Sequence, residues 1–223
     1  MTQTQAISQN IRTTIDSLPD DPDALRDEPD PGQVVQLLCR QKVTVRPARP
    51  QDTGIIQAYI RGLSPASRHN RFLGSLNEVS ANELYRMTHT DRCSHAALIA
   101  ENVVEGECTM IGEARYAVVP DGFHCELAVS VDDTWRRKTL GTLLVGIVAY
   151  QARALGLRYL IGEVFRWNEA MIALARKTRF ALSGPVADAR LVRVTKDLSL
   201  LDALQPWNEL ASQSWLIAAD KLK

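Results

Sequence analysis

The sequence lacks the features that mark membrane, metal-binding and secreted proteins. No apolar run approaches the roughly 20 residues that span a bilayer, and no basic segment followed by an apolar one stands at its start. The four histidines form no HxH or HExxH pattern, and no two cysteines lie at the close spacing of metal ligands. We therefore expect a cytoplasmic protein with reduced thiols, no metal site and no membrane partner.

Net charge is also lacking, because 26 basic side chains balance 26 acidic ones. The two signs are unevenly placed: residues 1–32 hold seven acids and two arginines, a net charge of −5, which leaves +5 on the rest of the chain. That surplus is too small to predict a nucleic-acid partner. The acidic segment has too few apolar groups to offset its ordering entropy. We predict that residues 1–41 form an acidic, proline-rich extension that is disordered at least to residue 32.

Beyond residue 41, the sequence alternates between the two-residue period of strands and the 3.6-residue period of helices. The predicted strands cover 43–48, 95–101, 110–119, 124–131, 158–165 and 190–198, and the predicted helices cover 52–61, 80–88, 140–155 and 168–178. Residues 64–76 indicate a short polar helix or a loop. This order predicts an α+β domain over residues 42–198. The tail, 199–223, has helical spacing, and we expect it to pack on the body or on a second copy of the chain in a homodimer.

A basic turn precedes the predicted helix at 140–155. Arg136, Arg137 and Lys138 lie where the free N–H groups and the positive dipole end of a helix already attract anions. A bound phosphate would remove the electrostatic conflict. The alternative is a solvated basic loop, and the spacing alone leaves both open.

A glutamate lies within the predicted strand at 124–131. Alternation puts Glu126, Ala128 and Ser130 on one face of that strand, and a face of small residues can line a cleft. Glu126 is either a general base in such a cleft or one half of a cross-strand ion pair.

Several stretches occur together in the order found in one known family. "VTVRPARPQD", "LSPASRHNRF", "CELAVSVDDTW" and "GEVFRWNEAMIALARK" resemble the GNAT superfamily of N-acetyltransferases, and within it the catalytic domain of Pat-type protein lysine acetyltransferases. The resemblance implies a mixed, mostly antiparallel sheet, flanked by helices, whose fourth and fifth strands splay apart to admit acetyl-CoA. It also implies direct transfer of acetyl to a protein lysine in a ternary complex, without a metal or a covalent acyl-enzyme. There are two alternatives. The chain could be an acetyltransferase that acts on a small amine, or a non-catalytic module that senses CoA or binds a partner.

The resemblance also assigns roles to residues. It makes Glu126 the general base and Asn168 a neighbour of the pantetheine arm of acetyl-CoA. Backbone groups of Val129, Ser130 and Val131 would pair with that arm. The family's pyrophosphate loop, Gln/Arg-x-x-Gly-x-Gly/Ala, falls at the helix start on Arg136, Arg137, Lys138, Thr139, Leu140 and Gly141, followed by Thr142.

The sequence departs from the family pattern at three positions. Thr139 and Arg179 stand where the family has glycine, and Ala175 stands where many members carry a tyrosine that protonates the leaving thiolate. Arg71, in the segment that matches "SRxxRF", either contacts the acceptor or braces the first helices.

Overall fold

The structure is a computed structural model that describes residues 33–37, 41–91, 93–104, 106–185 and 188–200. The predicted disorder over residues 1–32, and all but the first two residues of the predicted helical tail at 199–223, lie outside these ranges. Within them, no helix is long and apolar enough to cross a bilayer.

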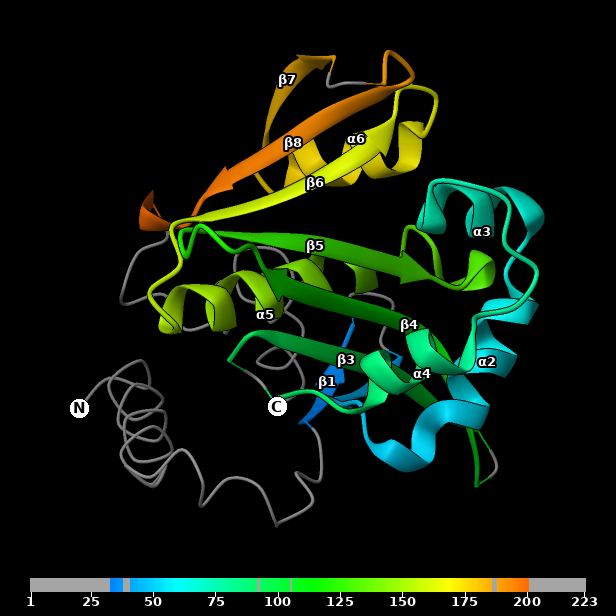
Figure 1. The fold of residues 1–223 in the computed structure, drawn as a ribbon. Coiled ribbons are helices and arrows are strands. Elements are labelled where there is room, and N and C mark those ends of the chain that lie inside the picture. The colour runs from blue at the N-terminus through cyan, green and yellow to red at the C-terminus, as the bar shows by residue number, and fades with distance from the viewer. Residues whose placement is uncertain (1–32, 38–40, 92, 105, 186–187, 201–223) are drawn as a thin grey trace, which may run out of the picture. The chain divides into compact units, whose positions relative to one another are not determined.

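One mixed sheet of eight strands organises the described residues, in the order β1-β2-β3-β4-β5-β6-β8-β7 (Figure 1). All neighbouring strands are antiparallel except β5 and β6, which are parallel. The strands are β1 (Gln33–Gln36), β2 (Lys42–Pro47), β3 (His95–Val104), β4 (Glu107–Val118), β5 (His124–Val131), β6 (Tyr159–Phe165), β7 (Ala181–Pro185) and β8 (Leu191–Asp197). The mixed, mostly antiparallel α+β sheet that we predicted is therefore confirmed.

Helices cover both faces of this sheet. They are α2 (Thr53–Gly62), α3 (Pro65–Phe72), α4 (Ala81–Thr88), α5 (Leu140–Ala154) and α6 (Glu169–Lys177). Alternation along β3 separates two apolar cores: Leu98 packs in one core with residues of α5, and Ile99 packs in the other with residues of α2 and α4. The face shared with α2 and α4 is the one to which Glu113 and Ser130 also point, since they bond to residues of α2 and α3.

Two elements differ from the sequence-based expectation, because the edge strands β1 and β7 were not predicted. Residues 65–72 form the helix α3, which is one of the two alternatives that the sequence left open. β1 pairs with β2, so the sheet begins ten residues before the expected first strand at 43. Ser64 starts α3 because its hydroxyl accepts a hydrogen bond from the N–H of Ser67, with Pro65 in the first turn.

The two parallel strands at the centre of the sheet separate along their length. β5 and β6 pair at Glu126 and Ile161 and at the two positions before them, and their pairing stops there. β5 runs on to Val131 and β6 to Phe165, and the two strands diverge in Figure 1. β5 and β6 are the fourth and fifth of the strands predicted from the sequence, so the predicted splay is confirmed. The last five residues of β5 pair with β4 on one edge and leave the edge toward β6 without a strand.

Candidate active site

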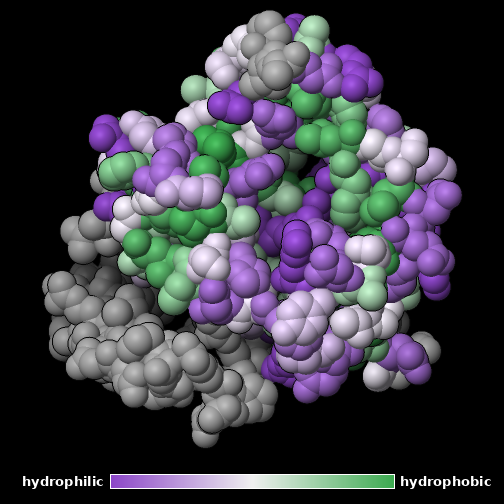
Figure 2. All heavy atoms as spheres, in the orientation of Figure 1, coloured by the Kyte–Doolittle hydropathy of each residue, from purple (hydrophilic) through white to green (hydrophobic). Residues whose placement is uncertain are grey.

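A large cleft opens where β5 and β6 diverge. Its volume is about 1390 Å³, more than the 300–1,000 Å³ typical of small-molecule pockets. One wall is formed by α3, α4, β4 and β5, the opposite wall by β6 and α6, and the start of α5 closes one end. Figure 2 shows the surface hollowed below β6, with hydrophilic side chains gathered along the lower border. The cleft is large enough for a long, partly charged ligand and a second substrate.

Most of the residues that the sequence assigned to the site line this cleft. The lining includes Glu126, Val129, Ser130, Val131, Arg136, Arg137, Thr139, Gly141, Thr142 and Asn168. Two others do not line it. Leu140 is fully buried in the core, and Nζ of Lys138 lies 4.5 Å from the centroid of the Trp135 ring.

The turn before α5 has backbone groups suited to an anion. The first hydrogen bond of the helix runs from the N–H of Leu143 to the carbonyl of Thr139, at 3.1 Å. The N–H groups of Leu140, Gly141 and Thr142 therefore precede it and have no acceptor among the described residues. A diphosphate fits these free donors and the positive end of the helix dipole.

Two left-handed residues shape this turn. Arg137 has a φ of 59° and Thr139 a φ of 72°, a region that a β-branched residue rarely adopts. The hydroxyl of Thr139 bonds to the carbonyl of Lys138 and does not cap the helix. Gly141 packs closely against α6, because a Cβ there would lie 3.2 Å from Cδ2 of Leu174 and that side chain would have to shift to make room. Thr139 thus adopts the left-handed conformation that glycine takes at little cost.

Replacing Thr139 by glycine should stabilise the protein. The left-handed strain of about 1–2 kcal/mol is removed, and the extra entropy of glycine cancels about half of it. We expect the melting temperature to rise by about 1–4 °C in calorimetry, and the backbone N–H donors of the turn remain in the variant. Arg179→Gly is the matched control, since Arg179 has a φ of 61° but does not line the cleft. A lower melting temperature for Thr139→Gly would show that the turn is not strained.

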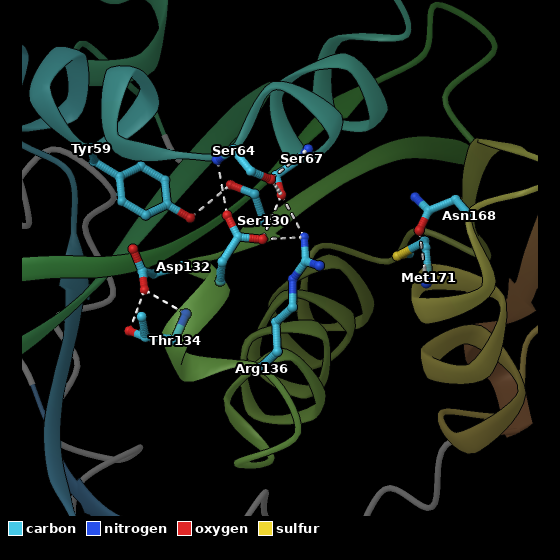
Figure 3. A network of polar contacts seen from close by, with 10 residues as sticks. Tyr59, Ser64, Ser67, Ser130, Asp132, Thr134, Arg136, Asn168 and Met171 are labelled. Carbon is cyan, nitrogen blue, oxygen red and sulfur yellow. Dashed lines mark hydrogen bonds and ion pairs between the residues drawn. The ribbon is translucent and has the colours of Figure 1, made fainter.

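The side chain of Arg136 is held on the α3 wall. Its Nη2 lies 2.8 Å from Oδ1 of Asp133 and donates to Oγ of Ser67 at 2.5 Å. Figure 3 shows Arg136 pointing toward Ser67, with Asn168 lying apart from this cluster at the start of α6. Burial alone would raise the pKa of Asp133, but the N–H of Ser64, the hydroxyl of Ser67 and the charge of Arg136 hold that pKa below its ordinary value. This cluster fixes the start of α3 against the turn that leads into α5.

A second polar network lies buried beneath the same wall. Oε1 of Glu113 accepts hydrogen bonds from Nε of Arg71 at 2.6 Å and from Oγ of Ser130 at 3.0 Å. Because Ser130 gives its hydroxyl hydrogen to Glu113, the Tyr59 hydroxyl donates to Ser130, also at 3.0 Å (Figure 3). Burial opposes ionisation of Glu113, yet Arg71 and Arg115 lower its pKa. Burial also raises the pKa of Tyr59.

This network separates the two predicted roles of Arg71. Its side chain is 4% exposed and ties α3 to β4 through Glu113, so the contacts favour bracing. Nη2 of Arg71 is buried without a partner among the described residues. Ser130 is held in the same network, so its backbone, rather than its hydroxyl, remains for a ligand in the cleft.

Glu126 occupies the point where the splay begins. It is the last residue of β5 to pair with β6, and its side chain is exposed in the cleft. It has no hydrogen bond or ion pair with any described residue, so the structure gives no support to the cross-strand ion pair. Glu163, the other carboxylate on these two strands, lies 3.0 Å from Nη2 of Arg193.

Asn168 combines a structural and an exposed position. Its Oδ1 accepts from the N–H of Met171 at 3.2 Å and so caps α6, as its sequence context predicts. Its side chain also lines the cleft opposite β5.

Neither a metal cluster nor a reactive thiol accompanies these groups in the described residues. No set of three or more metal-ligating side chains occurs there. Cys125, next to Glu126, is fully buried, and its burial raises the pKa of the thiol to about 12.

Comparison with known proteins identifies the family to which this chain belongs. A model of the acetyltransferase (GNAT) family matches residues 67–180. The chain is 33% identical over 129 residues to Acetyltransferase PA5475 of Pseudomonas aeruginosa, covering 58% of this chain and 69% of that protein. The chain belongs to the acetyltransferase (GNAT) family, and it is an N-acetyltransferase with acetyl-CoA as its co-substrate.

Solved structures share the fold at lower identity. The GNAT domain of S. lividans PAT has a TM-score of 0.67 at 23% identity, over 74% of this chain and 96% of that one. A spermidine N-acetyltransferase from Vibrio cholerae has a TM-score of 0.56 at 16% identity, over 70% of this chain and 96% of that one.

Proposed function

We propose that this protein transfers the acetyl group of acetyl-CoA to the side-chain amine of a lysine in another protein, with Glu126 as the general base. The observation that carries the proposal is an exposed carboxylate, at the start of the splay between β5 and β6, that has no partner among the described residues. The likeness to the S. lividans domain supports a protein acceptor. A small amine is the second candidate, which the likeness to the spermidine enzyme supports.

The proposed reaction needs a base because a lysine is charged at neutral pH. Its ammonium, with a pKa near 10.4, must lose a proton before the nitrogen can attack. Glu126 accepts that proton, directly or through one water. The nitrogen then bonds to the acetyl carbon and releases its second proton to solvent, the carbon–sulfur bond breaks, and the CoA thiolate leaves. A thiolate leaves without an acid to protonate it, since its parent thiol has a pKa near 8.5, so the alanine at position 175 is compatible with turnover.

The open edge of β5 and the start of α5 are suited to the two halves of acetyl-CoA. Backbone groups of residues 129–131 face the splay, where an extended amide chain can add to a sheet edge. The free N–H groups of Leu140, Gly141 and Thr142 suit the diphosphate. Thr139 and Arg179, whose departure from glycine motivated the non-catalytic alternative, both adopt the left-handed conformation that glycine would take. The backbone donors needed for binding are therefore retained.

Direct attack predicts that the buried thiol is dispensable. Replacing Cys125 by alanine should leave kcat within about twofold of the wild-type value, because a thiol with a pKa of about 12 supplies almost no thiolate nucleophile. Steady-state kinetics and intact-mass measurement of the enzyme after incubation with acetyl-CoA test this. An acetylated Cys125, or loss of turnover in a folded Cys125→Ala protein, would indicate a covalent intermediate instead.

The acceptor class is tested by following the acetyl label. The enzyme is incubated with radiolabelled acetyl-CoA and a cell extract, and separately with a panel of low-molecular-weight amines. We expect the label to enter the protein fraction as acetyl-lysine. Label found in the small amines alone would reject the protein acceptor and favour the second candidate.

A further inference from the structure

The α4 side of the cleft carries positive charge that the proposed chemistry does not use. Arg86 and Glu83 lie on α4 three residues apart, so both point to the same side of the helix. Both also line the cleft, as does Arg115 on β4. Nη1 of Arg115 lies 2.7 Å from Oε1 of Glu83, which brings the β4 guanidinium beside the helix face that carries Arg86.

The two arginines differ in how far their charge is satisfied. Glu83 occupies one nitrogen of Arg115. The side chain of Arg115 is 24% exposed and that of Glu83 is 33% exposed. Arg86 is exposed and has no hydrogen bond or ion pair with any described residue. This wall therefore holds a guanidinium that is free to bind an anion, beside another that is only partly used.

Strand register sets the distance from Arg115 to the proposed base. Ala117 pairs with Glu126, and Arg115 pairs with Ala128. Arg115 and Glu126 are therefore diagonal neighbours on one face of the sheet, with main chains on the order of 7 Å apart. If the acceptor lysine places its ammonium at Glu126, the side chain of the residue next to that lysine would lie near Arg115 and Arg86.

We infer that the preferred acceptor lysine has an acidic side chain beside it in its protein, and that Arg86, with Arg115, binds that carboxylate. Guanidinium groups bind carboxylates through paired, charge-assisted hydrogen bonds. The same charges repel a polyamine, whose second ammonium would fall near Arg115. This inference rests on the proposed function, since it specifies the acceptor at the same site.

The inference is tested with matched lysine peptides and the full-length enzyme. One peptide carries Glu and Asp beside the lysine, and its partner carries Gln and Asn. We expect kcat/KM to be about 5–10-fold higher for the acidic peptide at low salt, and this ratio to shrink at high salt because exposed charges are screened. Arg86→Gln should bring the ratio close to one, and Arg86→Glu should reverse it.

A matched variant separates recognition from general effects of charge. Arg176 is also an exposed arginine in the last turn of a helix, but it does not line the cleft. Arg176→Gln should keep the wild-type ratio. Acetyl transfer to both peptides with equal efficiency, or an acidic preference that Arg86→Gln leaves unchanged, would overturn the inference while the proposed lysine acetylation stands.

Further acceptors distinguish two other outcomes. One is a carboxylate supplied by a small amino acid, and the other is failure of the proposed function. Nα-acetyl-lysine and its carboxamide differ only in a free carboxylate. A preference confined to this pair would assign the cations to a small amino acid and overturn the inference. Acetylation of spermidine but of neither peptide would overturn both the inference and the protein acceptor.

Discussion

Replacing Glu126 by glutamine should lower kcat by about 10²–10⁴-fold, the range in which general bases contribute to catalysis. Glutamine keeps the size of the side chain and cannot accept the ammonium proton. Acetyl-CoA affinity should change little, because the free backbone donors at residues 140–142 are untouched. Steady-state kinetics with a lysine peptide, together with calorimetric titration of acetyl-CoA, separate the two effects.

Glu163→Gln is the matched control for this prediction. Glu163 lies on β6 in the same cleft, but it is paired with Arg193. A partly exposed ion pair contributes about 0–1 kcal/mol, so kcat should stay within a few-fold of the wild-type value. If Glu126→Gln retains full turnover, or if Glu163→Gln abolishes it, Glu126 is not the base.

Replacing Glu113 by glutamine should be the most destabilising of the substitutions considered. Glu113 and Arg71 have side chains only 2% and 4% exposed, and the variant leaves a buried guanidinium without its carboxylate. Breaking such a pair costs about 3–5 kcal/mol. Chemical denaturation at pH 7 measures this loss.

The exposed pair of Arg61 and Glu78 gives the control. Its atoms approach to 2.5 Å, yet the two side chains are 57% and 63% exposed. Glu78→Gln should therefore cost less than about 1 kcal/mol. Similar losses for the two glutamate variants would show that burial does not set the strength of the Arg71–Glu113 pair.

The buried pair of Arg71 and Glu113 also predicts how the stability of the protein depends on pH. Burial, the largest single influence, would raise the pKa of Glu113, but the charges of Arg71 and Arg115 and the hydrogen bonds from Arg71 and Ser130 together hold that pKa below its ordinary value of 4.5 in the folded protein. Its contribution to stability is therefore complete above about pH 4.5 and is lost as the pH falls through the lower, folded-state pKa. Denaturation between pH 3 and 7 should show a shallower acid loss in Glu113→Gln. Parallel curves for the two proteins would contradict this assignment.

The sequence predicts the central elements of the fold because their periodicity is strong. The apolar spacing of α5 and the alternation of β3, β4 and β5 needed no tertiary information. β7 was missed because "ALSGP" contains glycine and proline and reads as a turn. β1 was missed because four residues beside an acidic, proline-rich segment give little pattern, and its pairing with β2 is a tertiary contact.

The site was predictable where it is local in the sequence. Glu126 and the turn at 136–142 belong to consecutive elements, and the resemblance to the GNAT superfamily assigned both to one cleft. The pairing of Arg136 with Asp133 had a signal in their spacing of three residues. Arg71 and Glu113 lie 42 residues apart, and nothing in the sequence links them. Leu140 is the first residue of the apolar face of α5, and this explains its position in the core. The loop motif at 136–141 also contains Leu140 and gave the opposite prediction, that it lines the cleft.

The most direct test of the cleft as the acetyl-CoA site is a calorimetric comparison of CoA with pantetheine, which lacks the diphosphate and the adenosine 3′-phosphate attached to it. Contacts of the diphosphate with the free N–H groups and the dipole of α5 should contribute about 2–3 kcal/mol. We expect micromolar binding of CoA and binding of pantetheine weaker by about 100-fold. Equal affinity for the two ligands, or no binding of CoA, would contradict the assignment of the α5 turn as the diphosphate site.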